Sequence, residues 1–256
     1  MSETITYEQP LNERIRTFLR LEFLFKNLDA ALEGESELDH RDVIQALSSI
    51  LLVFDRSDLK QEIIKELERL ISNLSALENT PGVDKKALED LLGQLDQIVD
   101  SIQANKSAIG QALRDSDFLY SIRQRSSIPG GTCDFDLPAY HYWLLHSSLE
   151  SRKLQLTEWA SEFEGIRQAV TITLELIRGS TGFMNKTAAL GFYQHSLNNN
   201  QSTQLIRIRI PREASYYPEI SGGKHRFTVR FMAFDITQRS QQSNEDIEFS
   251  LSCCAM

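Results

Sequence analysis

The sequence predicts an α+β protein, with a helical bundle domain in its N-terminal and central parts and a mostly C-terminal antiparallel β-domain. Apolar residues recur at helical spacing from about residue 10 to 125 and again from 149 to 178. After residue 182 the spacing becomes the strict alternation of half-buried strands. Glycine and proline make up 18 of the 256 residues, below the usual ~12%, which favours long helices.

The first predicted helix follows Asn12, whose side chain suits the N-cap position. Its apolar stripe steps by three and four residues through Phe18, Leu21, Phe25, Leu28 and Leu32. A second helix is expected after a break at 33–36, with Asp39 as its cap and a stripe that ends near Phe54.

A third helix, from Ser57 or Asp58, and a fourth, capped by Asp84, flank a turn at 79–82 that contains Pro-Gly. The short turn favours an antiparallel hairpin packed on the other helices. A coiled coil between two chains is the alternative, but the stripes run for only about three heptads. Two shorter helical pieces follow, at 108–115 and 117–125.

The helical pattern stops at Pro129-Gly130-Gly131. We expect a short strand at 132–135, then a helix with Pro138 in its first turn, then a long helical region over 149–178. Alternating patterns at 205–210, 224–231 and 247–253 predict strands, and 4–7 is expected to join their sheet. The predicted domains are therefore 10–125 with 149–179 (helical) and 1–9, 126–148 with 180–256 (β).

Composition excludes several classes of protein. The longest apolar run, 50–54, is far shorter than the roughly 20 residues of a membrane span, and the N-terminus does not resemble a secretory leader. Three cysteines are too few for a disulfide framework. We therefore expect a cytoplasmic protein that does not enter a membrane.

No catalytic constellation is visible, so an enzyme is the least favoured class. Pro129-Gly130-Gly131 lacks the Gly-Lys-Ser/Thr ending of a phosphate loop, and no Gly-x-Ser-x-Gly elbow or zinc-type histidine pair occurs. Adjacent Cys253 and Cys254 would point to opposite faces of a strand, which argues against a shared metal ion. The carboxylates sit beside Lys or Arg on helix surfaces. We expect no cofactor and no metal.

Charge is unevenly distributed. The net charge is −9, yet residues 27–100 hold 17 acidic and 7 basic residues, whereas 183–232 hold 7 basic and 2 acidic residues. Isolated salt bridges and solvated faces would explain the basic residues. The other interpretation is one surface between the two domains that binds an anion or an acidic peptide, a role that suits the planar fork of arginine.

Five motifs resemble the ZapD family of cell division proteins. They are the opening Tyr7-Glu8-Gln9-Pro10-Leu11-Asn12-Glu13-Arg14-Ile15-Arg16 with its continuation to Glu22, the segment 123–138, Leu190-Gly191-Phe192-Tyr193-Gln194, the segment 217–232 with Tyr217-Pro218-Glu219-Ile220, and the ending 248–254. The resemblance covers essentially the whole chain, and only the acidic middle, 33–107, matches loosely.

The resemblance implies a non-enzymatic, cytoplasmic protein of the bacterial division ring at mid-cell. Family members form symmetric dimers, bind the C-terminal tail of the tubulin-like GTPase FtsZ and cross-link its protofilaments into bundles. Carried over by motif, the residues expected to hold that tail are Arg16, Arg20, Arg56, Arg114, Arg123, His141, Lys224, Arg226 and Arg230. Asp117 stands where the family can carry a basic residue, which shifts part of the basic rim to Arg114.

A nucleic-acid-associated protein is the alternative function. It would use a basic strand face made of Arg207, Arg209, Lys224, Arg226 and Arg230. The acidic total and the lack of exposed aromatic strand pairs count against it, so no nucleic-acid partner is expected.

Overall fold

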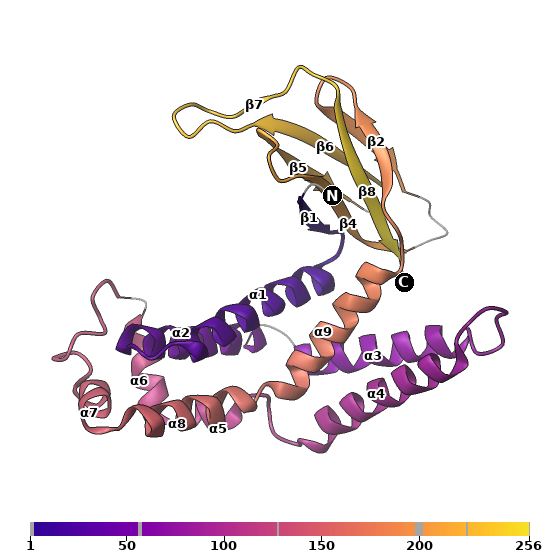
Figure 1. The fold of residues 1–256 in the computed structure, drawn as a ribbon. Coiled ribbons are helices and arrows are strands. Elements are labelled where there is room, and N and C mark those ends of the chain that lie inside the picture. Colours follow the sequence, from indigo (N-terminus) through magenta and orange to yellow (C-terminus); the bar gives the residue numbers. More distant parts are fainter. Residues whose placement is uncertain (1–2, 56–57, 127, 198–201, 224, 256) are drawn as a thin grey trace. The chain divides into compact units, whose positions relative to one another are not determined.

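The computed structural model describes residues 3–55, 58–126, 128–197, 202–223 and 225–255. The chain divides into two compact units, one made of residues 18–172 and the other of 1–17 with 173–256. The first unit is helical and the second contains the strands (Figure 1). This confirms the predicted α+β class, with a helical N-terminal region and a β C-terminal domain.

The helices follow the order expected from the apolar stripes. They are α1 (Glu13–Glu33), α2 (Glu37–Phe54), α3 (Leu59–Ser75), α4 (Lys85–Ala104), α5 (Gln111–Arg114), α6 (Asp117–Ser126), α7 (Pro138–His146), α8 (Leu149–Ser161) and α9 (Glu164–Gly179). In Figure 1, α3 and α4 lie side by side as the predicted hairpin. Their apolar stripes are buried within the chain, so this part of the fold needs no second chain to cover them.

Side-chain caps define several helix starts. The Asn12 side chain accepts a hydrogen bond from the Ile15 amide at 2.9 Å, and Asp84 accepts one from the Ala87 amide at 3.1 Å, as predicted. The expected cap of α2 was wrong: Ser36 is the N-cap, and Asp39 is its partner in a capping box. The hydrogen bond that Asp39 accepts from the Ser36 hydroxyl lowers the pKa of this carboxyl.

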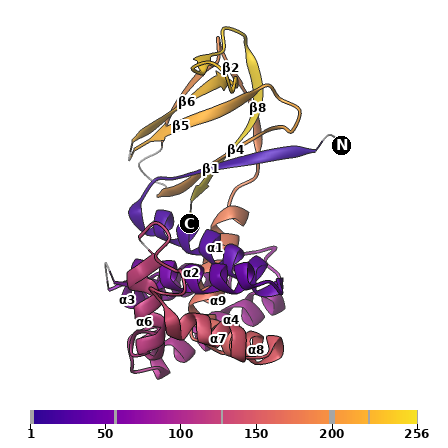
Figure 2. The ribbon, with the colours of Figure 1, turned by 90° about the vertical axis from the view of Figure 1, so that its left-hand side faces the viewer.

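An aromatic cluster holds α6, α7 and α8 together, and these helices are close to one another in Figures 1 and 2. Phe118, Tyr140, Trp143 and Trp159 have ring centroids 5.8–6.4 Å apart. Burial raises the pKa of Tyr140 to about 12. Both tryptophans of the chain belong to this cluster, so tryptophan fluorescence reports on the helical unit.

The region 126–148 differs from the expectation in two ways. Residues 132–135 form turns and not a strand, and the region lies in the helical unit, because the aromatic side chains of α7 pack on α6 and α8. The region 149–178 is helical, as predicted, and consists of the two helices α8 and α9. The chain turns at Phe163, which is fully buried and whose ring centroid lies 6.3 Å from that of Phe54, with the rings tilted by 31°.

The β unit is built from two antiparallel sheets. Its strands are β1 (Thr4–Pro10), β2 (Met184–Ala188), β3 (Phe192–Ser196), β4 (Thr203–Pro211), β5 (Tyr216–Gly222), β6 (Arg226–Ala233), β7 (Gln241–Gln242) and β8 (Ile247–Ala255). One sheet has the order β1-β4-β8-β2 and the other β3-β6-β5, with β7 on β6. Figure 2 shows β1 running along β4, which confirms that the N-terminal strand joins the C-terminal sheet.

The two sheets enclose one hydrophobic core. It is made of Ala188, Ile206, Ile208, Ile210, Phe227, Val229, Phe231, Ile247, Phe249 and Leu251. The alternation predicted for β4, β6 and β8 is confirmed, since the even residues of β4 and the odd residues of β6 and β8 point inward. The intervening polar residues line the outer faces.

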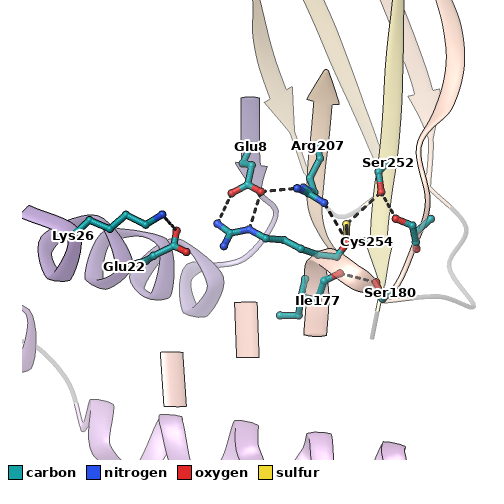
Figure 3. Close-up of polar contacts among 10 residues, drawn as sticks. Glu8, Glu22, Lys26, Ile177, Ser180, Arg207, Ser252 and Cys254 are labelled. Carbon is teal, nitrogen blue, oxygen red and sulfur yellow. Dashed lines mark hydrogen bonds and ion pairs between the residues drawn. The ribbon is translucent and has the colours of Figure 1, made fainter. Parts of the chain in front are cut away.

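A carboxylate braces the end of the sandwich from which α1 and α9 depart. Glu8 on β1 accepts hydrogen bonds from the Arg178 guanidinium at 2.9 and 2.7 Å and from Nε of Arg207 at 3.0 Å. Arg207 also donates to the Arg178 carbonyl at 3.2 Å. Figure 3 shows this contact beside Ser252, which donates to the Thr181 carbonyl. The three charged side chains are only 17–21% exposed, so they are partly desolvated.

Glu8→Gln is expected to destabilise the β unit by about 1–3 kcal/mol, because two half-buried guanidinium groups lose their shared carboxylate. Calorimetric unfolding measures the change. Glu3→Gln is the matched control, since Glu3 pairs with Arg212 at an exposed position. It is expected to change stability by less than about 0.5 kcal/mol. Equal effects of the two substitutions would contradict the bracing role.

His40 is a buried histidine in the first turn of α2. Its Nδ1 accepts a hydrogen bond from Nε of Arg152 at 3.1 Å, and Arg152 also donates to the carbonyls of Leu144 and Ser147. Burial, followed by the positive charges of Arg152 and Lys153, lowers the pKa of His40 from 6.5. The folded state therefore favours the neutral imidazole.

The helical unit is expected to lose stability as the pH falls below 6.5, because the unfolded chain then binds a proton that folded His40 resists. Above that pH the contribution is fully present. Urea unfolding followed by tryptophan fluorescence at pH 7.5 and 5.5 measures the loss. His40→Gln is expected to reduce the difference between the two pH values, whereas His146→Gln, at an exposed position, leaves it unchanged. An undiminished difference in His40→Gln would contradict the assignment.

Candidate partner-binding surface

The residues predicted to bind a partner divide between the two units. Arg20, Arg114, Arg123 and His141 belong to the helical unit, and Arg16, Arg226 and Arg230 belong to the β unit. Arg56 and Lys224 lie outside the described residues.

Three of the four helical-unit residues present their side chains to solvent to differing degrees. Arg20 on α1 is exposed and has no ion pair among the described residues. His141, in the first turn of α7, is exposed as well. Arg123 on α6 is half-buried, and its guanidinium lies 5.9 Å from the Tyr120 ring centroid. These positions are accessible to an anionic partner.

Arg114 is engaged within the fold. Its Nε and Nη2 donate to Asp55 at 3.1 and 2.8 Å, Nη1 donates to the Ile109 carbonyl, and Nη2 lies 3.4 Å from the Leu51 carbonyl. The guanidinium thus joins α5 to the C-terminal end of α2, where a positive charge is favourable. Its side chain is 20% exposed, so a partner would meet a largely saturated group.

The β-unit residues are more available. Arg16 pairs with Glu13 at 3.4 Å one helical turn away, with both side chains well exposed. Arg226 and Arg230 lie on the outer face of β6, opposite Ser196 and Phe192 of β3. Glu219 of β5 is the cross-strand neighbour of Arg230. Within the described residues no ion pair neutralises Arg226 or Arg230, so both guanidinium groups face solvent.

The basic strand face proposed for nucleic acid does not form. Arg207 and Arg209 lie on the outer face of the β1-β4-β8-β2 sheet, whereas Arg226 and Arg230 lie on the outer face of β3-β6-β5. The hydrophobic core separates the two faces. Arg207 is moreover held by Glu8, a contact across β1 and β4 that the sequence pattern did not reveal.

Several arginines without a place in the sequence prediction also act inside the fold. Arg178 and Arg152 hold the contacts described above, and Arg167 pairs with Asp29 and lies over the Phe25 ring. Their partners are 112 to 170 residues away in the chain, so no local spacing signals them. Arg178 and Arg167 form separate salt bridges, whereas Arg152 is held by His40 and two backbone carbonyls.

Two of the three cysteines are adjacent on β8, where Cys253 is half-buried and Cys254 is buried. Cys253 and Cys254 pair with Ile206 and Leu205 of β4, on opposite sides of the sheet. Burial raises the pKa of Cys253 to about 11 and also raises that of Cys254, so both thiols stay protonated. Across the residues that the structure covers, no three His, Cys, Asp or Glu side chains gather to hold a metal ion.

Comparison with known proteins confirms the family resemblance that the sequence motifs indicated. The family of the cell division protein ZapD matches residues 19–230. The chain belongs to the ZapD family. It is 40% identical over 256 residues to the cell division protein ZapD of Methylococcus capsulatus, with 100% of both chains covered. It is also 40% identical to ZapD of Coxiella burnetii, with 99% of both covered. Family membership assigns the chain a role in cell division.

This chain of the ZapD family therefore carries basic residues of two kinds, some exposed to solvent and some held by contacts within the fold. None of the described helices combines the length and apolar character needed to cross a bilayer.

A pair of variants, Arg114→Gln and Arg20→Gln, distinguishes an arginine that is held within the fold from one that is exposed on the surface. Arg114→Gln is expected to destabilise the helical unit by about 1–3 kcal/mol, because Asp55 and two carbonyls lose their donor. Arg20→Gln is expected to stay within about 0.5 kcal/mol of the parent. Urea unfolding followed by tryptophan fluorescence measures both. Similar stabilities for the two variants would show that Arg114 does not join α5 to α2.

Proposed function

We propose that this ZapD-family chain is a non-enzymatic assembly factor of the division ring. A dimer binds the C-terminal tail of FtsZ through the basic residues and cross-links protofilaments into bundles, in the cytoplasm at mid-cell. The observation that carries the proposal is a set of exposed arginines, Arg20, Arg226 and Arg230, for which the described residues show no ion pair, in a chain that matches ZapD proteins over its whole length.

The spacing of Arg226 and Arg230 suits an extended acidic peptide. The two residues are four apart on one strand, a distance of about 13 Å at the usual rise per residue. Carboxylates at alternate positions of an extended peptide repeat at about half that distance, so every second one meets a guanidinium group. Each contact gains the two-pronged geometry that arginine offers to a carboxylate.

Bridging follows from symmetry and tethering. A two-fold dimer presents the same tail site twice, so two tails from different filaments are held together. Individual contacts need only be weak, because many tethered tails raise the effective concentration along a filament. A basic surface that binds an acidic segment also makes bundling sensitive to salt.

Arg114 has a smaller direct part in this scheme than its motif implies, because Asp55 already holds it. Arg123 and His141 contribute beside Arg20 in the helical unit. Arg16, Arg56 and Lys224 complete the proposed basic surface.

Arg20→Glu is expected to abolish bundling while the dimer persists, because the substitution reverses an exposed charge that no internal contact uses. Sedimentation equilibrium reports the dimer, and pelleting of GTP-assembled FtsZ reports bundling. Lys26→Glu is the control on the same helix, since it makes the same charge change at a residue already paired with Glu22. Normal bundling by dimeric Arg20→Glu protein would overturn the site assignment.

Co-pelleting with full-length FtsZ and with FtsZ lacking its C-terminal tail tests the function itself. Bundles are expected only with the intact tail and are expected to weaken as salt rises. Tail-independent pelleting would move the partner surface elsewhere. If nothing pellets, a gel shift at moderate salt decides whether nucleic acid is the partner.

A further inference from the structure

A polar hollow opens on the outer face of the β1-β4-β8-β2 sheet, on the other side of the sandwich from Arg226 and Arg230. Its volume is about 370 Å³, within the range of small ligand sites. The side chains that matter for its chemistry come from four strands: Thr4, Asn185, Arg209, Glu248 and Ser250. All belong to the β unit.

Arg209 is the central charge of this hollow. It lies between Thr6 of β1 and Ser250 of β8 in the sheet register. Its guanidinium carbon is 3.8 Å from the Phe183 ring centroid, so the aromatic face fixes the plane of the guanidinium group. Arg209 Nε is buried without a hydrogen-bond acceptor. In the described part of the chain no carboxylate pairs with this guanidinium group.

Arg207, on the same strand, differs from Arg209 because its guanidinium group has hydrogen-bond acceptors within the fold. Arg207 is two residues away on the same face and lies over the same Phe183 ring at 5.1 Å. Its donors are taken by Glu8 and by the Arg178 carbonyl. The difference between the two arginines is therefore an acceptor, which Arg207 has inside the fold and Arg209 lacks.

The surroundings of Arg209 add a hydrogen-bond donor. The Ser250 hydroxyl donates to Oδ1 of Asn185 at 3.1 Å, which leaves the Asn185 amide group available as a donor. Glu248 lies on the same outer face as Arg209, whereas Lys186 lies on the core side of β2, opposite Phe249.

We propose that this hollow is a second docking site, which takes a carboxylate side chain of an acidic polypeptide segment onto Arg209. The guanidinium fork, already held flat by Phe183, pairs with the two carboxylate oxygens. Asn185 and Thr6 are placed to hydrogen-bond to the same segment. The site is distinct from the FtsZ-tail surface because the two lie on different sheets, and it does not rest on that assignment.

Charge favours a carboxylate over a phosphate. A carboxylate carries one negative charge, which matches the single positive charge of the Arg209 guanidinium group. A phosphate monoester or a nucleic-acid strand brings more negative charge, and Glu248 at the rim repels it. An acidic peptide also suits the open, shallow sheet surface, across which an extended chain can lie.

The test is fluorescence anisotropy with a labelled octapeptide that alternates Glu and Gly and has blocked termini. The full chain carries Arg226→Gln and Arg230→Gln, so that the other sheet does not capture the peptide. In this background Arg209→Gln is expected to weaken binding by about five- to ten-fold, and Arg209→Lys, which keeps the charge but not the fork, by about two- to three-fold.

Arg212→Gln is the matched control, since it removes one positive charge from an exposed arginine just beyond β4. It is expected to change affinity by less than about two-fold. Thermal unfolding followed by circular dichroism confirms that each variant is folded. Equal weakening by Arg212→Gln and Arg209→Gln, or equal binding of a Gln-Gly peptide, would overturn the proposal.

Competition separates the two kinds of anion. Acetate is expected to displace the peptide, and inorganic phosphate at the same ionic strength is expected to do so no better. Preferential displacement by phosphate would overturn the carboxylate assignment. The two sites act independently if Arg209→Gln removes peptide binding in the Arg226→Gln, Arg230→Gln background and if the chain that carries Arg209→Gln alone still bundles FtsZ normally.

Discussion

The shared carboxylate of Glu8 is the constraint around which the β unit is organised. The helical unit is inserted in the chain between β1 and β2, so the sheet must hold its N-terminal strand and the end of α9 at one edge of the sandwich. Glu8 does this with one side chain, because it binds Arg178 at the end of α9 and Arg207 on β4. Hydrophobic burial supplies the bulk of the stability, and this charged contact specifies how the chain enters and leaves the sheet.

The arginines of the described residues fall into two groups, those held by acceptors within the fold and those without such an acceptor. Arg152, Arg167, Arg178 and Arg207 are used internally by acceptors from distant parts of the chain. A guanidinium group with acceptors already in place has fewer donors left for a partner, and a carboxylate also offsets the charge of Arg167, Arg178 and Arg207. Arg20, Arg226 and Arg230 have no such acceptor among the described residues, which supports the role proposed for them in binding the FtsZ tail.

A sandwich with two polar outer faces can hold two independent anion sites. The core between the sheets prevents a single partner segment from reaching both Arg209 and Arg226 through one face. An acidic segment bound on one face therefore does not compete with a segment bound on the other.

The sequence by itself determined the class, most helices and the strands whose inner faces alternate cleanly, since the periods of 3.6 and 2 follow directly from local geometry. It determined the caps at Asn12 and Asp84 for the same reason. Only the tertiary structure decided that residues 132–135 form turns, that the chain bends at Phe163, and that Arg207 and Arg226 lie on opposite faces. Strand order and distant ion pairs depend on how separate segments meet, and no local pattern contains that information. The motifs could therefore nominate basic residues, but only the fold could show that Arg114 is already bound and that Arg209 is not.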